Sequence, residues 1–110
     1  MQTPKLGHAP ITLRRRDSEE NLERRGDFCW LGGEDGKRTL VIAMPCDPRW
    51  RDNTKGGEPY SMCRWSIGYK NHSGAQWSWD GDEDKPTLSP SLHWVGVWHG
   101  YVENGVMREA

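Results

Sequence analysis

The sequence has few of the residues that usually build or cross-link a small domain. It contains one Phe and three Cys among 110 residues, and only 34% of the residues are apolar. An odd number of Cys argues against the disulfide framework of a small secreted domain. No apolar run approaches the ~18–20 residues that span a bilayer, and the N-terminus lacks the apolar stretch of a signal peptide. These absences predict one cytoplasmic domain with reduced thiols.

The sequence also lacks an excess of charge of one sign. The formal net charge is −1, with a slightly basic N-terminal part and a mildly acidic remainder. Nucleic-acid binding needs basic clusters that displace counterions, and the globular part has none. The basic run at residues 14–16 is followed at once by acidic residues, which is typical of a solvated tail. Nucleic acid is therefore not an expected partner.

Tryptophan is abundant, with seven copies in a chain that has little other large apolar material. Each indole can bury ~150–250 Å², so most of these rings are expected in the core. Trp50 is the expected exception, because it lies between Arg49 and Arg51 in a polar loop. Exposed Trp and Arg are typical anchors of protein interfaces. These three residues are the predicted contact with a protein partner.

The first 26 residues predict an N-terminal arm. Residues 1–16 have scattered apolar positions without a period and read as extended or disordered. Residues 17–25 carry a helix signature, with Asp17 as a cap and Gly26 as a stop. This helix would be marginal, because so short a segment with a single apolar residue has no face to bury.

From residue 27 onward the pattern predicts one all-β domain that extends to residue 110. Turn-forming residues separate short segments of alternating or continuous apolar character. The Asn104–Gly105 pair predicts a type I′ hairpin turn. Gly96 is read as a bulge within one long strand. The predicted strands cover residues 28–31, 39–44, 62–69, 75–80, 87–98 and the two arms of the last hairpin. Six to eight short antiparallel strands predict a small β-sandwich or open barrel.

Three motifs follow one another in the C-terminal half. They are Trp-Ser-Trp-Asp-Gly-Asp at residues 77–82, Pro-Thr-Leu-Ser-Pro-Ser at 86–91 and Trp-His-Gly at 98–100. In order and spacing they resemble a family of small uncharacterised proteins encoded by phages and prophages. The resemblance is strong over residues 75–107 and absent from the first 26. It implies a shared β fold.

The same resemblance implies a bound zinc, since family members often carry a cysteine-rich turn and a cysteine near the late histidine. Cys46 and Cys63 stand at the early positions and His99 at the late one, with His72 or His93 as the fourth ligand. Four such ligands suit tetrahedral Zn²⁺. The sequence departs from the pattern, because no Cys precedes His99 and the spacing of the two Cys matches no known finger. The alternative is that both Cys are buried apolar residues and that His99 bonds a turn.

The alternating acids Asp80, Asp82 and Asp84 resemble a calcium loop. The sixth position of that loop is Lys85 instead of Gly, and the twelfth is Ser91 instead of Glu. The EF-hand interpretation therefore fails, and a solvated turn is expected.

Combinations of Ser, His and Asp exist through Ser89, through His93 or His99, and through Asp80. No strained nucleophile elbow surrounds any Ser, which argues against a catalytic triad.

The small number of candidate catalytic residues and the high tryptophan content together predict a phage-type binding protein without catalytic activity. Its expected partner is a host defence component or a virion protein. Two alternatives remain open: a zinc-dependent hydrolase with an open metal position near His99, and a virion structural or accessory protein.

Overall fold

The computed structural model describes residues 7, 9–32, 38–46, 59–70 and 74–110. Within these ranges the chain forms ten short strands and one 3₁₀ turn, η1 (Glu19–Asn21). The strands are β1 (Ile11–Thr12), β2 (Arg14–Arg15), β3 (Asp27–Gly32), β4 (Arg38–Pro45), β5 (Tyr60–Ile67), β6 (Ser78–Trp79), β7 (Leu88–Ser89), β8 (Leu92–Trp94), β9 (Trp98–Glu103) and β10 (Val106–Glu109). No helix in this part of the chain is long and apolar enough to cross a membrane.

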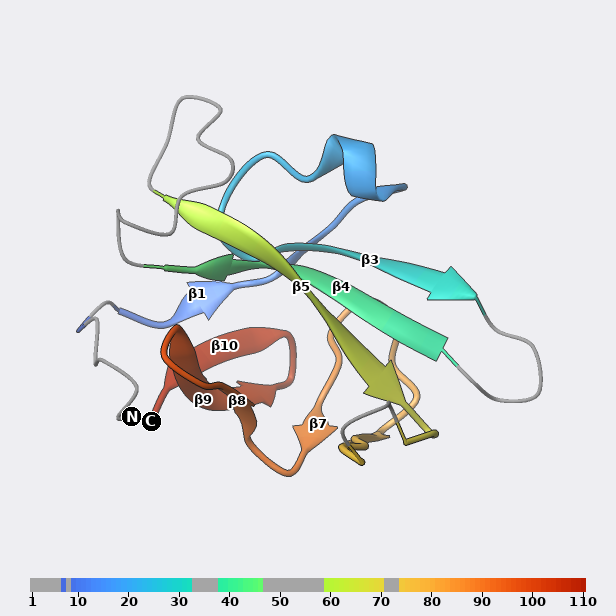
Figure 1. The fold of residues 1–110 in the computed structure, drawn as a ribbon. Helices are drawn as coiled ribbons and strands as arrows, with labels where there is room; N and C mark the ends of the chain where they lie inside the picture. The colour runs from blue at the N-terminus through green and yellow to red at the C-terminus, as the bar shows by residue number, and fades with distance from the viewer. Residues whose placement is uncertain (1–6, 8, 33–37, 47–58, 71–73) are drawn as a thin grey trace.

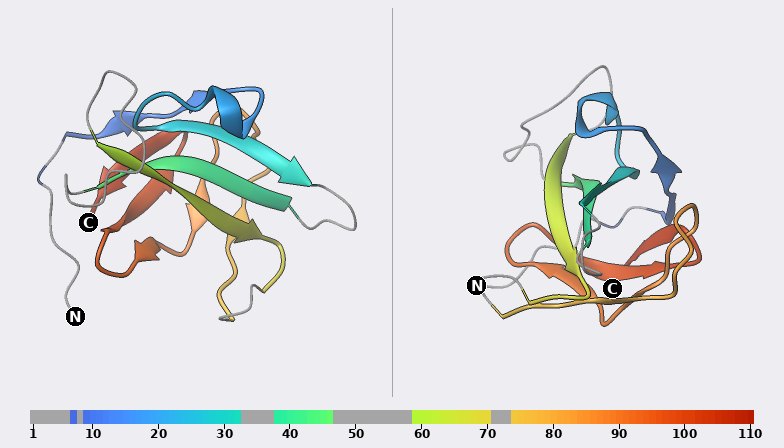
Figure 2. Two further views of the ribbon diagram at one scale, coloured as in Figure 1. Left: turned by 45° about the horizontal axis from the view of Figure 1, so that its top comes forward. Right: turned by 90° about the vertical axis from the view of Figure 1, so that its right-hand side faces the viewer.

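The strands build two four-stranded sheets and a two-stranded ribbon. One sheet has the order β2-β3-β4-β5 and the other β1-β10-β9-β8, while β6 pairs with β7. Figures 1 and 2 show β3, β4 and β5 in one layer and β8, β9 and β10 in another. Every pair of named strands is antiparallel except β2–β3. The all-β prediction is confirmed, and the sheets do not close into a barrel.

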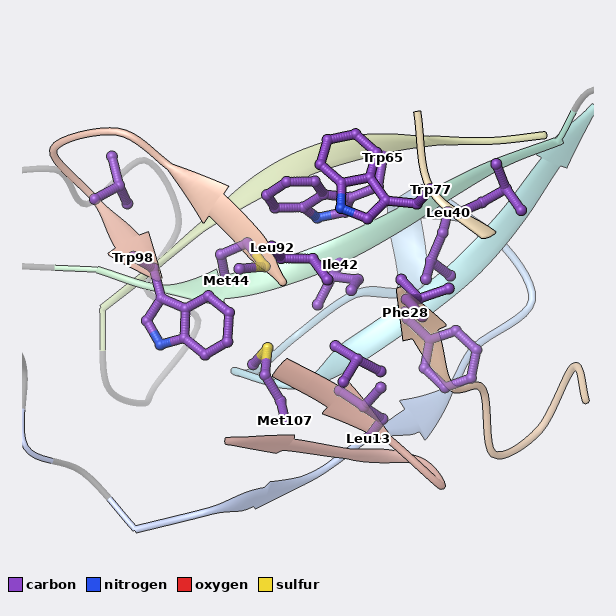
Figure 3. Close-up of a cluster of buried hydrophobic side chains, with 14 of the residues drawn as sticks. Leu13, Phe28, Leu40, Ile42, Met44, Trp65, Trp77, Leu92, Trp98 and Met107 are labelled. Atoms are coloured by element: carbon purple, nitrogen blue, oxygen red, sulfur yellow. The ribbon is translucent and has the colours of Figure 1, made fainter. Parts of the chain in front are cut away.

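The core between the layers is a cluster of aliphatic side chains and aromatic rings, and Trp65, Trp77 and Trp98 are buried in it as expected (Figure 3). Trp65 and Trp77 meet edge to face with ring centroids 5.0 Å apart, and Trp98 is fully buried. Trp30, Trp79 and Trp94 are partly buried against the same cluster. Trp50 lies outside the described residues. The six described Trp therefore all contribute to the core, and none of them is a large exposed apolar residue.

The segment around Leu13 differs from the expected arm. β1 pairs with β10 in one sheet and β2 pairs with β3 in the other, so residues 11–15 link the two layers. Leu13 lies between them and is buried in the core. A partly buried ion pair holds the crossing, since Arg14 donates two hydrogen bonds of 2.7 Å to the buried carboxylate of Asp27. This segment has both an apolar anchor and a charge partner, which its sequence alone does not reveal.

The expected helix at residues 17–25 is reduced to the three residues of η1. Its N-cap residue, Ser18, is extended and makes no side-chain cap hydrogen bond. Leu22, directly after η1, is buried in a small cluster with Cys29 and Val41. Leu22 alone thus anchors this segment on β3 and β4, although the segment does not form a continuous helix.

The expected single strand over residues 87–98 is wrong. The chain runs through β7, bends, forms β8, turns at residues 95–97 and enters β9. Gly96 has φ +82° and lies in a tight turn closed by a 2.8 Å hydrogen bond from the Val97 N–H to the Trp94 carbonyl. Gly96 is therefore the hinge of a β8–β9 hairpin instead of a bulge. The other turn prediction is confirmed, because Asn104 and Gly105 both have positive φ between β9 and β10.

Candidate functional site

The β8–β9 hairpin brings a serine and a histidine together. Its register pairs His93 with His99 and Leu92 with Gly100. Ser91 directly precedes β8, so it is a diagonal neighbour of His99 on the same face of the hairpin. The Ser91 Oγ and His99 Nε2 atoms are 3.2 Å apart. This distance is within the range for a nucleophile and its general base.

Buried groups fix the backbone of Ser91. The indole Nε1–H of Trp77 donates a 3.1 Å hydrogen bond to the Ser91 carbonyl, and Trp77 itself packs on Trp65. The next residue, Leu92, is fully buried. Core packing therefore holds the main chain on both sides of a side chain that remains only partly buried.

Neighbouring rings fix the plane of His99. The His93 ring on the paired strand lies with its centroid 4.4 Å from that of His99, and the Tyr101 ring, two residues along β9, lies at 6.5 Å. Within the described ranges, the hydrogen bond to Ser91 is the only one that the His99 side chain makes. The arrangement is thus a Ser–His pair with a second, tilted imidazole against the first, and no carboxylate of the described chain completes a triad.

An open cleft begins at Ser91. It has a volume of about 530 Å³ and is lined by one segment, Thr87 to Ser91, and by two residues of β9, Tyr101 and Glu103. Leu88 and Pro90 give it apolar surface. A cleft of this size fits a short stretch of extended peptide directly beside the serine.

Main-chain hydrogen bonds hold the two walls of the cleft at a fixed separation. The Asn104 N–H donates to Thr87 Oγ1 at 2.8 Å, and the Gly105 N–H donates to the Pro86 carbonyl at 3.0 Å. These contacts tie the start of the Thr87–Ser91 wall to the turn after β9. The cleft is therefore a preformed feature of the fold.

The acidic turn before this wall is structural. Asp80 Oδ1 accepts from the N–H groups of Asp82 and Thr87, and Asp82 Oδ1 accepts from those of Asp84 and Lys85. The hydrogen bonds from the N–H groups of Lys85 and Asp84 lower the pKa of Asp82 below its usual value. The two carboxylates thus shape the loop that leads into β7.

Two of the predicted zinc ligands, Cys46 and Cys63, lie apart in the described structure. Cys46 is buried just after β4, whereas Cys63 lies in β5 opposite Ile42. Cys46 is four residues further along the chain than Ile42, the residue opposite Cys63, which corresponds to ~13 Å along the strand. The described part of the chain contains no group of three His, Cys, Asp or Glu side chains that could hold a metal. Burial also raises the pKa of the Cys63 thiol to about 12, which disfavours the thiolate that zinc requires.

Four of the predicted site residues cannot be placed. His72, the fourth zinc ligand, and the interface group of Arg49, Trp50 and Arg51 lie outside the described residues.

Ser91 is not among the catalytic candidates that the sequence indicated. The candidate serine was Ser89, and the lack of a nucleophile elbow argued against a triad. The signal was available in the last two motifs, which end in Ser91 and include His99. Reading Gly96 as a hairpin turn would have set the two residues diagonally across two paired strands.

Comparison with known proteins identifies the family. Residues 15–110 match the family model described as bacterial ubiquitination-like system serine protease (BubE). The chain belongs to this family. No curated protein and no solved structure matches the chain.

The family overturns the functional prediction made from the sequence. Its description names a serine protease of a bacterial system, so the expectation of a non-catalytic phage-type or virion protein is wrong. The zinc-dependent hydrolase also disagrees with a family described by a serine mechanism. The inference that failed was to equate a missing nucleophile elbow with a missing nucleophile.

Proposed function

Proceeding from membership of this serine-protease family, we propose that the chain hydrolyses peptide bonds with Ser91 as nucleophile and His99 as general base. The observation that supports this assignment is the 3.2 Å separation of His99 Nε2 from the Oγ of Ser91, which lines the cleft.

The chemistry follows from this pair. His99 Nε2 takes the hydroxyl proton while Ser91 Oγ attacks the carbonyl carbon of the substrate and forms a new C–O bond. The tetrahedral adduct collapses, the C–N bond breaks, and His99 gives the proton to the leaving amine. A water molecule then attacks the acyl group, with His99 again accepting the proton. The C–O bond to Ser91 then breaks while His99 gives this proton to Ser91 Oγ, which releases the carboxylic acid and restores the Ser91 hydroxyl.

His93 takes over part of the task that an aspartate performs in a triad. An aspartate holds the catalytic imidazole in one orientation. Here the His93 ring, 4.4 Å away, packs on His99 and restricts its rotation. His93 is a positioning residue in this scheme, because it does not touch Ser91 Oγ within the described contacts.

The family description also supports a class of substrate. We propose that the substrates are proteins of a ubiquitination-like system, cleaved within an extended segment. An open cleft beside Ser91 accepts an extended segment more readily than a folded surface.

The direct test uses purified full-length protein and a mixed-sequence library of fluorogenic peptides. Ser91→Ala is expected to lower kcat by at least ~10³-fold, the scale seen when a serine nucleophile is removed. Ser89→Ala is the matched control, because Ser89 lines the same cleft, whereas the described hydrogen bond of the His99 side chain is to Ser91. Hydrolysis that survives Ser91→Ala, or that is lost equally in Ser89→Ala, would overturn the assignment.

A further inference from the structure

The outward face of β9 forms a row of side chains that leads away from Ser91. His99, Tyr101 and Glu103 alternate with buried residues, so all three lie on the same side of the strand. Tyr101 is 41% exposed and is one of three exposed large hydrophobic residues in the described part of the chain. Tyr101 and Glu103 line the cleft together with Ser91. The cleft therefore extends from the proposed nucleophile to a carboxylate.

Tyr101 and Glu103 have the chemistry that recognises a basic side chain. An aromatic face attracts a guanidinium or an ammonium group and packs along its aliphatic stem. A carboxylate accepts charge-assisted hydrogen bonds from the same group. The molecule itself displays this recognition, because the Arg108 guanidinium lies 5.4 Å from the Tyr101 ring centroid and pairs with Glu103.

Arg108 is a replaceable occupant of that position. Its side chain is 54% exposed and that of Glu103 is 57% exposed. Exposed ion pairs contribute little to stability, so an incoming basic side chain can exchange with Arg108 at little cost. Glu103 lines the cleft and is positioned to receive it.

The strand register sets the distance from the scissile bond. Continuing the β8–β9 register by one residue places Ser91 opposite Tyr101. Glu103 is two residues further along β9, or ~7 Å, and an extended substrate advances ~3.4 Å per residue. A basic residue near Glu103 is then one to three positions from the bond that Ser91 attacks.

On the basis of the proposed protease function, we infer that Tyr101 and Glu103 form a specificity subsite for a Lys or Arg of the substrate. This residue lies within three positions of the cleaved bond. Arg108 occupies the subsite when no substrate is bound.

The experiment compares fluorogenic peptides that differ only in Lys or Gln at each of three positions on either side of the scissile bond. The wild-type protein is expected to cleave the best Lys peptide with a kcat/KM about threefold to fivefold above its Gln counterpart, the scale of one exposed ion pair. Glu103→Gln should remove this preference by raising KM for the Lys peptide while kcat stays unchanged. Arg108→Gln should lower KM for the same peptide, because it removes the internal occupant.

Glu23→Gln is the matched control, since Glu23 is 53% exposed and pairs with Arg16 away from the cleft. It should retain the wild-type preference. Labelling of Ser91 by a fluorophosphonate distinguishes a failure of the proposed subsite from a failure of the proposed protease function. Labelled Ser91 without a Lys preference, or with a preference that persists in Glu103→Gln, overturns the subsite alone. Absence of both labelling and cleavage overturns the proposed function and the subsite with it.

Discussion

Strand β9 separates two regions of the molecule with opposite demands. On its inner face Trp98 and Val102 are fully buried, and Gly100 packs so closely on the Trp98 ring and the Arg108 carbonyl that a Cβ would clash. On its outer face His99 and Tyr101 remain accessible beside the cleft. Successive side chains of β9 point in turn to the inner face and to the outer face. One short segment thus carries both the packing of the core and the groups of the candidate site.

This comparison shows why the site needs a rigid support. A nucleophile and base must keep their separation to within a fraction of an ångström, and exposed side chains alone do not provide this precision. Buried neighbours in sequence provide it for His99, and Trp77 provides it for Ser91. Substitutions on the outer face should therefore change catalysis, and those on the inner face should change stability.

The largest expected effect is on the outer face. His99→Gln should lower kcat by ~10²–10⁴-fold, because it removes the general base. Its melting temperature should remain close to that of the wild type, since His99 is only partly buried. Peptide hydrolysis and thermal melts measure both quantities. A large loss of stability together with activity would show that His99 has a structural role.

A substitution on the inner face of β9 should lower stability. Trp98→Ala is expected to reduce the free energy of unfolding by ~3–5 kcal/mol, the cost of truncating a large core aromatic. Denaturant titration measures this change. Tyr101→Ala, on the same strand but exposed, is the control and should cost far less. Equal losses for the two variants would contradict the division of β9 into two faces.

A third prediction concerns the ion pair that joins the layers. Arg14→Gln should cost ~2–3 kcal/mol, because it leaves the buried Asp27 carboxylate without its bidentate partner. The loss stays below that of an isolated buried charge, since Arg24 also approaches Asp27 at 3.7 Å. The exposed pair of Arg108 and Glu103 is the control, and Arg108→Gln should cost under ~1 kcal/mol.

The same ion pair predicts the response to acid. Burial raises the pKa of Asp27, but hydrogen bonds from Arg14, Glu23 and Arg24 outweigh it and hold the pKa below its usual value. A group with a lowered pKa in the folded state stabilises above its unfolded pKa of ~3.9 and loses that stability as pH falls through the folded value. Wild-type stability should therefore drop below about pH 4, and Arg14→Gln should weaken this dependence. An identical acid transition in both proteins would refute the role of Asp27.

The smallest effect tests the link between the two regions. Trp77→Phe keeps an aromatic ring against Trp65 but removes the donor to the Ser91 carbonyl. Stability should fall by only ~1–2 kcal/mol. The value of kcat should fall about tenfold, because small displacements of a reacting group are costly. Unchanged kcat would mean that this hydrogen bond does not position Ser91.

The fold could be predicted from the sequence where local patterns decide it. Short apolar segments between turn formers predicted β3, β4 and β5, and Asn104–Gly105 predicted the last hairpin. The crossing at Leu13 could not be predicted, because its partners are a distant strand and the Asp27 carboxylate. Long-range pairing of this kind leaves no local signal.

The candidate site was only half visible in the sequence. His99 was singled out, but as a zinc ligand in company with Cys46 and Cys63, which the register of β4 and β5 keeps apart. Ser91 was overlooked because its role depends on a turn at Gly96 that also fits a bulge. Because Gly96 was interpreted as a bulge, the sequence did not indicate that Ser91 and His99 lie close together.

The most direct test of the account is covalent labelling of the intact protein with diisopropyl fluorophosphate, followed by peptide mapping. An activated serine displaces fluoride and retains the phosphoryl group. The account predicts one adduct per chain, located on Ser91, and strongly slowed labelling in His99→Gln. An adduct on another serine, or labelling of Ser91 at the same rate in His99→Gln, would contradict the pairing of Ser91 with His99 as the catalytic centre.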